Sequence, residues 1–159
     1  MKEVFIKRGE VYKIKNNSKI KSIFARKKTN LYVKENFSLY GLKNFMNVNL
    51  PLNENTELIP DSDIKIVLED YKPCKSEQIE LKPGENILQF SYDIHFILAT
   101  SNLKERTSLI AEINSVDVTL CNLNKFVSTN EINFECKKGK SQKFYVLGKD
   151  KIFLIGLKF

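Results

Sequence analysis

The stretch that most strongly indicates the fold is Leu88-Gln89-Phe90-Ser91-Tyr92-Asp93-Ile94-His95-Phe96-Ile97-Leu98. Its even-numbered positions are all aliphatic or aromatic, and its odd-numbered positions are polar apart from Ile97. A period of two places alternate side chains on opposite faces of a β-strand. We therefore expect one face of this stretch, with Phe90 and Phe96 on it, to line the core.

Shorter alternating runs recur on both sides of this stretch, over residues 46–52, 64–68, 116–120 and 132–136. In the third of these, Val116, Val118 and Leu120 alternate with Ser115, Asp117 and Thr119. Turn sequences such as Lys82-Pro83-Gly84-Glu85 separate the runs. No stretch keeps a helical period of 3.6 for ten residues. The pattern predicts an all-β fold of about nine or ten short strands: one antiparallel β-sandwich domain over 1–159, with a jelly roll as one candidate topology.

Charge is distributed unevenly along the 159 residues, whose net charge is +7. Residues 1–28 hold ten basic and two acidic side chains, residues 29–136 hold nine and sixteen, and residues 137–159 hold seven and one. Such segregation suits docking on an acidic partner or on another copy of the chain. The alternative is that the lysines only solvate exposed strands and sheet edges. The candidate partner-binding residues are Lys7, Arg8, Arg26, Lys27 and Lys28.

Catalytic and metal-binding signatures are weak. The chain has one histidine, His95, and its neighbours Ser91 and Asp93 would lie roughly 7 Å apart along one strand face, too far for a hydrogen-bonded triad. Asp61 and Asp63, with Glu69 and Asp70, allow an oxygen-rich calcium site or an ordinary acidic turn. We expect a protein that is not an enzyme and that uses no cofactor and no metal.

Cysteine usage and apolar runs suggest where the chain acts. Cys74, Cys121 and Cys136 are widely spaced, which favours reduced, partly buried thiols. No apolar run approaches the roughly 20 residues that span a bilayer. The apolar stretch at the N-terminus is too short for a signal peptide. We therefore expect neither a membrane partner nor export by the general secretory route.

Nucleic acid is a further candidate partner for a basic chain. Residues 12–28 mix aromatic and basic side chains, as grooves that stack bases do. Tyr12, Ile14, Ile20 and Phe24 also lie at strand spacing, which suits a core. Lysine and asparagine dominate the composition, as an AT-rich coding sequence would produce, whereas bidentate phosphate recognition prefers arginine. The sequence therefore disfavours nucleic acid as a partner.

Residues 79–90, Ile79 to Phe90, join an apolar strand, a Pro-Gly turn and a second strand. This segment resembles jelly-roll carbohydrate-binding modules and small β-sandwich accessory proteins of tailed-phage virions. The resemblance covers about twelve residues and implies no ligand chemistry. It favours a non-catalytic structural or interaction protein of a bacteriophage particle or phage-like assembly, as a capsid decoration, neck, tail or baseplate component assembled in the host cytoplasm.

The expected partners are other virion proteins or copies of the chain itself. The first alternative is a carbohydrate-binding β-sandwich, for which Tyr32, Tyr40 or Tyr92 would replace the missing tryptophan platforms. The second alternative is a nucleic-acid-binding β domain.

Overall fold

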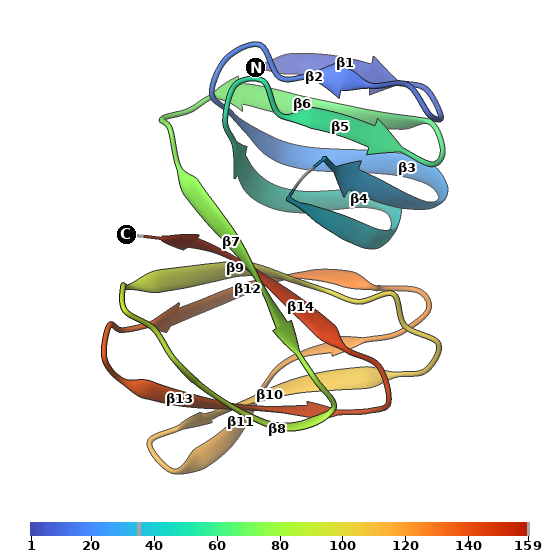
Figure 1. Ribbon diagram of the computed structural model, residues 1–159. Helices are drawn as coiled ribbons and strands as arrows, with labels where there is room; N and C mark the ends of the chain where they lie inside the picture. Colours follow the sequence, from blue (N-terminus) through green and yellow to red (C-terminus); the bar gives the residue numbers. More distant parts are fainter. Residues whose placement is uncertain (35, 159) are drawn as a thin grey trace. The chain divides into compact units, whose positions relative to one another are not determined.

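The computed structural model describes residues 1–34 and 36–158, and the chain divides into two compact units, Met1–Lys75 and Ser76–Phe159 (Figure 1). The described residues form 14 strands and no helix, and the strand pairs described are antiparallel. The all-β, antiparallel prediction is therefore confirmed. None of the described segments is a helix that could cross a membrane. One domain over 1–159 stays a prediction.

The first unit is a six-stranded sheet in the order β1-β6-β3-β5-β2, with β4 paired to β3. Alternate residues of these strands fill its interior, including Ile23, Leu50 and Ile66, all less than 2% exposed. The strands are β1 (Lys2–Ile6), β2 (Tyr12–Lys13), β3 (Ser18–Val33), β4 (Phe37–Leu52), β5 (Glu57–Pro60) and β6 (Ile64–Asp70).

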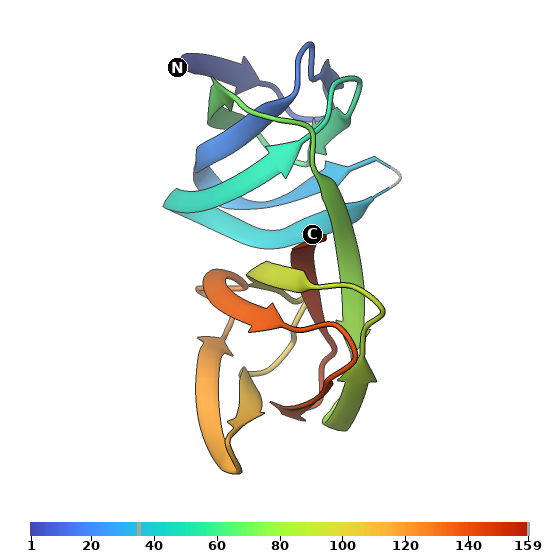
Figure 2. The same ribbon diagram turned by 90° about the vertical axis from the view of Figure 1, so that its left-hand side faces the viewer.

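Strand β3 changes partner halfway along its length (Figure 2). Residues 18–25 pair with β6, and residues 31–33 pair with β5. The register against β4 shifts between Ala25 and Thr29, so the intervening residues leave the regular ladder. Arg26, Lys27 and Lys28 lie in this interval and are all exposed.

The second unit contains two four-stranded sheets, ordered β12-β9-β14-β7 and β11-β10-β13-β8. Side chains from both sheets form one core, in which the Phe144 ring contacts Phe96 and Phe134 at centroid distances of 6.2 and 5.4 Å. The strands are β7 (Lys75–Leu81), β8 (Gly84–Gln89), β9 (Ile94–Thr100), β10 (Thr107–Ile113), β11 (Val116–Leu123), β12 (Thr129–Cys136), β13 (Ser141–Leu147) and β14 (Ile152–Lys158).

The predicted strand number, nine or ten, is too low. Strands β2 and β5 contain only two and four residues, too few to show a period of two. The stretch 88–98 is also not one strand: it ends β8, turns, and begins β9. Its apolar face is nevertheless confirmed, since Phe90, Ile94 and Phe96 are buried in the core.

The alternating apolar positions of β11 are not all buried. Val116 and Val118 are exposed, because they pair with Ile113 and Ala111 near the free end of the β10–β11 hairpin (Figure 1). The buried positions of this strand are Cys121 and Leu123, and Leu120 is only partly buried against the core.

Candidate binding groove

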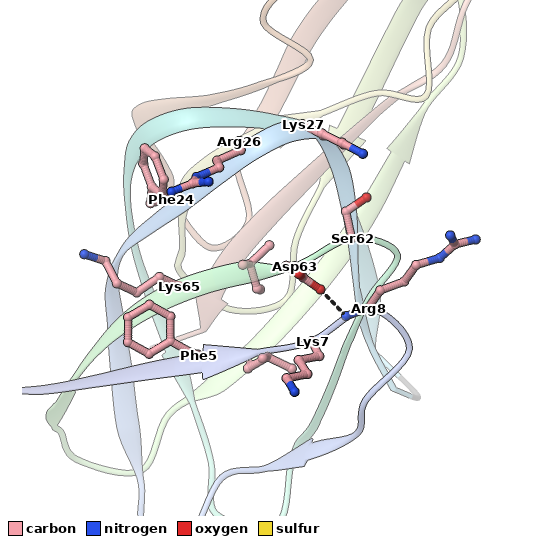
Figure 3. Close-up of a pocket in the computed structure, with 11 residues that line it drawn as sticks. Phe5, Lys7, Arg8, Phe24, Arg26, Lys27, Ser62, Asp63 and Lys65 are labelled. Atoms are coloured by element: carbon pink, nitrogen blue, oxygen red, sulfur yellow. Dashed lines mark hydrogen bonds between the residues drawn. The ribbon is translucent and has the colours of Figure 1, made fainter.

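A groove of about 680 Å³ opens on the first unit where β3 leaves β6 (Figure 3). Its walls come from β1 and the residues after it, from the middle of β3, and from the start of β6 with the turn before it. The lining residues are Phe5, Ile6, Lys7, Arg8, Phe24, Arg26, Lys27, Ser62, Asp63, Ile64 and Lys65.

Aromatic rings and a lysine form a row along the outer face of the sheet beside this groove. Phe5 of β1 is paired with Lys65 of β6, Lys65 with Phe24 of β3, and Phe24 with Phe45 of β4. Directly paired residues of antiparallel strands present their side chains on the same face. We call Phe5, Phe24, Phe45 and Lys65 the aromatic row; Figure 3 shows the Phe5 and Phe24 rings on either side of Lys65.

The three rings of the aromatic row are open to solvent. Phe5 is 72% exposed, Phe24 38% and Phe45 65%. A bulge explains why Phe24 points outward: the register against both β4 and β6 shifts between Ile20 and Ser22. The extra residue changes the phase of the strand, so that Ile20 and Ile23 are both buried and Phe24 is not.

Basic side chains border the groove, and four of them are not paired with acidic side chains of the described residues. Among the described residues, the side chains of Lys7, Arg8, Arg26 and Lys27 form no salt bridge. The one carboxylate in the lining, Asp63, accepts a hydrogen bond of 2.8 Å from the backbone N–H of Arg8.

Lys65 has only a loose acidic neighbour. Its Nζ lies 3.7 Å from a carboxylate oxygen of Glu3, which is 61% exposed. A solvent-exposed pair of this kind contributes little and can exchange for another anion. The groove therefore combines exposed phenylalanine rings with basic side chains that can pair with an acidic ligand.

Four of the five sequence-predicted contact residues, Lys7, Arg8, Arg26 and Lys27, line this one groove. The fifth, Lys28, is exposed on the same segment of β3 but is not part of the lining. The sequence brings Phe24 to notice but does not place Phe5, Phe45 and Lys65 beside it. Phe24 lies at a strand spacing that also suits a core, and only the bulge at residues 20–22 places it outside.

The catalytic and metal candidates are dispersed or occupied. The Asp93 carboxylate accepts the backbone N–H of Lys138, and the His95 ring is hydrogen-bonded to Asn133. Asp61 accepts the backbone N–H of Asn30, while Glu69 is ion-paired with Lys19 at 3.0 Å. Over residues 1–34 and 36–158, no three histidine, cysteine or acidic side chains group as metal ligands.

All three cysteines are free thiols. Cys121 and Cys136 are buried in the core of the second unit, and burial raises the pKa of each thiol to about 11. Cys74 is partly exposed and lies at the end of the first unit. The chemistry of the two buried thiols is that of small apolar core residues.

Two of the three candidate sugar platforms share a second, shallower groove of the first unit. Tyr32 and Tyr40 line it together with Asn30, Ser38 and Asp61, in a volume of about 460 Å³. Tyr92 is already engaged elsewhere: its hydroxyl donates to Glu77, and burial with that carboxylate raises the pKa of Tyr92 to about 12.

No protein-family model matches the sequence, and no curated protein is significantly similar to it. Among solved structures, the chain is similar to the nucleoplasmin-like N-terminal domain of Drosophila FKBP39, at 14% identity and a TM-score of 0.49, over 54% of this chain and 88% of that one.

Two further solved structures are similar over nearly the whole chain. An archaeal virus turret protein with a triple jelly roll fold matches 98% of this chain and 58% of its own, at 12% identity and a TM-score of 0.30. The regulatory subunit of a cAMP-independent protein kinase A from Trypanosoma brucei matches 99% and 73%, at 7% identity and 0.25. With TM-scores below 0.5, these similarities assign neither fold nor function.

Proposed function

We propose that this chain is a non-catalytic interaction protein of a multi-copy assembly, in which the groove of the first unit holds an acidic partner. The observation that carries this proposal is the convergence of Lys7, Arg8, Arg26 and Lys27 on one groove. These side chains lie up to 20 positions apart in the sequence, and the fold gathers them around exposed aromatic rings. An exposed apolar surface beside unpaired charge is typical of a binding site.

The strand order of the second unit supports an assembly role. Six of the seven connections between its strands pass from one sheet to the other, and only β10–β11 is a hairpin within a sheet. The two sheets enclose a single core. This order is that of an eight-stranded jelly roll, a topology used by viral capsid and lectin domains. Fold alone does not assign function, so the proposal depends on surfaces as well.

An apolar hairpin end supplies such a surface. Ile113, Val116 and Val118 are all exposed at the free end of β10–β11, and Asn114 and Ser115 form its turn with φ of 51° and 65°. Exposed ion pairs contribute only about 0–1 kcal/mol each, so charge can orient a partner while apolar contacts provide affinity. A bacteriophage particle or phage-like assembly is the setting we propose, with other particle proteins or copies of the chain as partners.

The test of this proposal is incorporation into particles of the triple variant Arg26→Glu, Lys27→Glu, Lys28→Glu. The variant should incorporate poorly at low salt, because three cations that meet an acidic partner become anions. The matched control is Lys125→Glu, Lys138→Glu, Lys140→Glu, which makes the same change in net charge on exposed lysines of the second unit. Equal incorporation of both variants and the wild type, at low and high salt, would remove this groove from the assembly contact.

A carbohydrate site is the second candidate function, favoured by the shared groove of Tyr32 and Tyr40. Aromatic platforms beside amide, hydroxyl and carboxylate groups can bind sugar rings. Glycan-array binding that is lost in Tyr32→Ala and kept in the charge-reversed variant would support this function over the first.

A further inference from the structure

We propose that the acidic partner held by the groove is single-stranded nucleic acid, with bases stacked on the aromatic row and phosphates against the surrounding cations. This inference rests on the proposed function, since it names the chemical class of the partner. It departs from the sequence-based expectation, which disfavoured nucleic acid. The placement of the phenylalanine rings, rather than the number of lysines, is the reason for the difference.

The rings are arranged as a stacking surface. Neighbouring strands lie about 4.8 Å apart, so Phe24 and Phe45 are adjacent on the sheet, while Phe5 stands two strands, or roughly 10 Å, from Phe24. Successive bases of a single strand can be spread over such a row, because every base has a π-face and stacking on aromatic side chains tolerates any sequence. A duplex keeps its bases stacked internally and offers no such face.

The cations occupy positions suited to the backbone of such a strand. Lys65 stands between Phe5 and Phe24 in the aromatic row, and Lys7, Arg26 and Lys27 line the same groove. These are the positions that phosphates would reach when bases lie on the rings. The Arg26 guanidinium adds a flat cationic group of the kind that also stacks on bases.

Charge resides mainly on the unit that carries the groove. The first unit, residues 1–75, contains 15 basic and nine acidic side chains, a net charge of +6. The second unit, residues 76–159, contains 11 and ten, a net charge of +1. A polyanion would therefore be steered to the unit that presents the aromatic row.

An acidic protein is the competing occupant, and the exposed side chains argue against it. The centre of a protein interface is enriched in aromatic side chains but depleted of charged ones, lysine in particular. In the aromatic row, the charged side chain of Lys65 stands between Phe5 and Phe24. This alternation of ring and cation matches the alternation of base and phosphate better than it matches the apolar centre of a protein interface.

The experiment is fluorescence anisotropy of the full chain with a labelled oligothymidylate and with a duplex of equal length. Phe5→Ala, Phe24→Ala and Phe45→Ala should each weaken binding of the single strand by between about five-fold and 150-fold, the range seen for loss of one stacked base. The matched control is Phe126→Ala, a ring 73% exposed in the second unit, which should leave binding unchanged.

The salt dependence tests the phosphate contacts separately. Affinity falls with salt, so the slope of log affinity against log salt is negative. Lys7→Gln or Arg26→Gln should each make this slope shallower by about 0.7, the value for one phosphate of a single strand. Lys138→Gln, on an exposed turn of the second unit, should not change the slope. An unchanged slope in both groove variants would place the phosphates elsewhere.

Three results would overturn the inference: no binding of the single strand, equal or tighter binding of the duplex, or binding that the phenylalanine variants leave intact. Competition with polyglutamate distinguishes this failure from failure of the proposed function. If polyglutamate binds the groove and the single strand does not, an acidic protein is the partner and only the inference fails. If neither polyanion binds and the charge-reversed variant still enters particles, both fail.

Discussion

Single side chains of the second unit show how closely its core is packed. The Phe90 ring is 8% exposed and lies 5.9 Å from the Phe96 ring, centroid to centroid. We expect Phe90→Ala to lower the free energy of unfolding by about 3–5 kcal/mol, because a large buried ring is replaced by a cavity. Urea denaturation measures this loss, and Phe126→Ala, on an exposed ring, should change the stability by less than about 0.5 kcal/mol. A loss below about 1 kcal/mol for Phe90→Ala would mean that the site is solvated.

Cysteine reactivity offers a second measurement at the residue scale. Because burial raises the pKa of Cys121 and Cys136 to about 11, both stay protonated and unreactive near pH 8. We expect iodoacetamide to modify Cys74 first in the native chain and all three thiols in denaturant. Rapid native labelling of Cys121 would contradict its buried position.

The same two thiols predict a dependence of stability on pH. Their folded pKa values are raised above the ordinary thiol value of 9.0, so the folded chain favours the neutral form. Their contribution to stability is complete below about pH 9 and is lost as the pH rises toward 11, because the unfolded chain then gains free energy by ionising. Replacing both cysteines by alanine should reduce the fall in urea midpoint between pH 9 and pH 11.

At the scale of the element, the absence of a side chain at Gly156 allows β14 to lie close to β9. A Cβ at Gly156 would stand 2.8 Å from two side-chain carbons of Ile94 and 2.9 Å from a ring carbon of Phe96. Gly156→Ala should therefore destabilise the chain by about 1–3 kcal/mol, as overpacking does. Ile94→Val removes one of these two carbons, the terminal methyl, and should recover part of the loss in the double variant, as measured by thermal unfolding. If the double variant loses the sum of the two single effects, the clash lies elsewhere.

The strands also show where alternation in the sequence predicts burial correctly and where it does not. Alternation correctly places Ile64, Ile66 and Leu68 of β6 in the core, because this strand pairs with β1 without a register shift. It fails for Phe24, because a bulge at residues 20–22 depends on pairing with β4 and β6, which lie far away in the sequence. The four basic residues of the groove could be predicted because the excess of basic over acidic side chains in residues 1–28 is visible in the sequence. The aromatic row, in contrast, forms only when four strands are in register.

At the scale of the whole molecule, the division into two units has no counterpart in the sequence. No glycine- or proline-rich linker separates residues 1–75 from 76–159. We expect residues 72–159 expressed alone to fold, because the core of the second unit is built from its own side chains. Dispersed amide resonances and a cooperative thermal transition would demonstrate this. A disordered fragment would favour the single domain predicted from the sequence.

The bulge in β3 has a consequence for how such a surface persists. Deleting the single codon of Lys21 would leave Ile20, Ile23 and Ala25 at alternate positions of an unbroken strand, all facing the core. Phe24 would stay on the outer face, and the aromatic row would keep its central ring. In evolutionary terms, the bulge absorbs an inserted residue without exchanging the faces of the strand, so a lineage can gain or lose one codon here and still keep this groove.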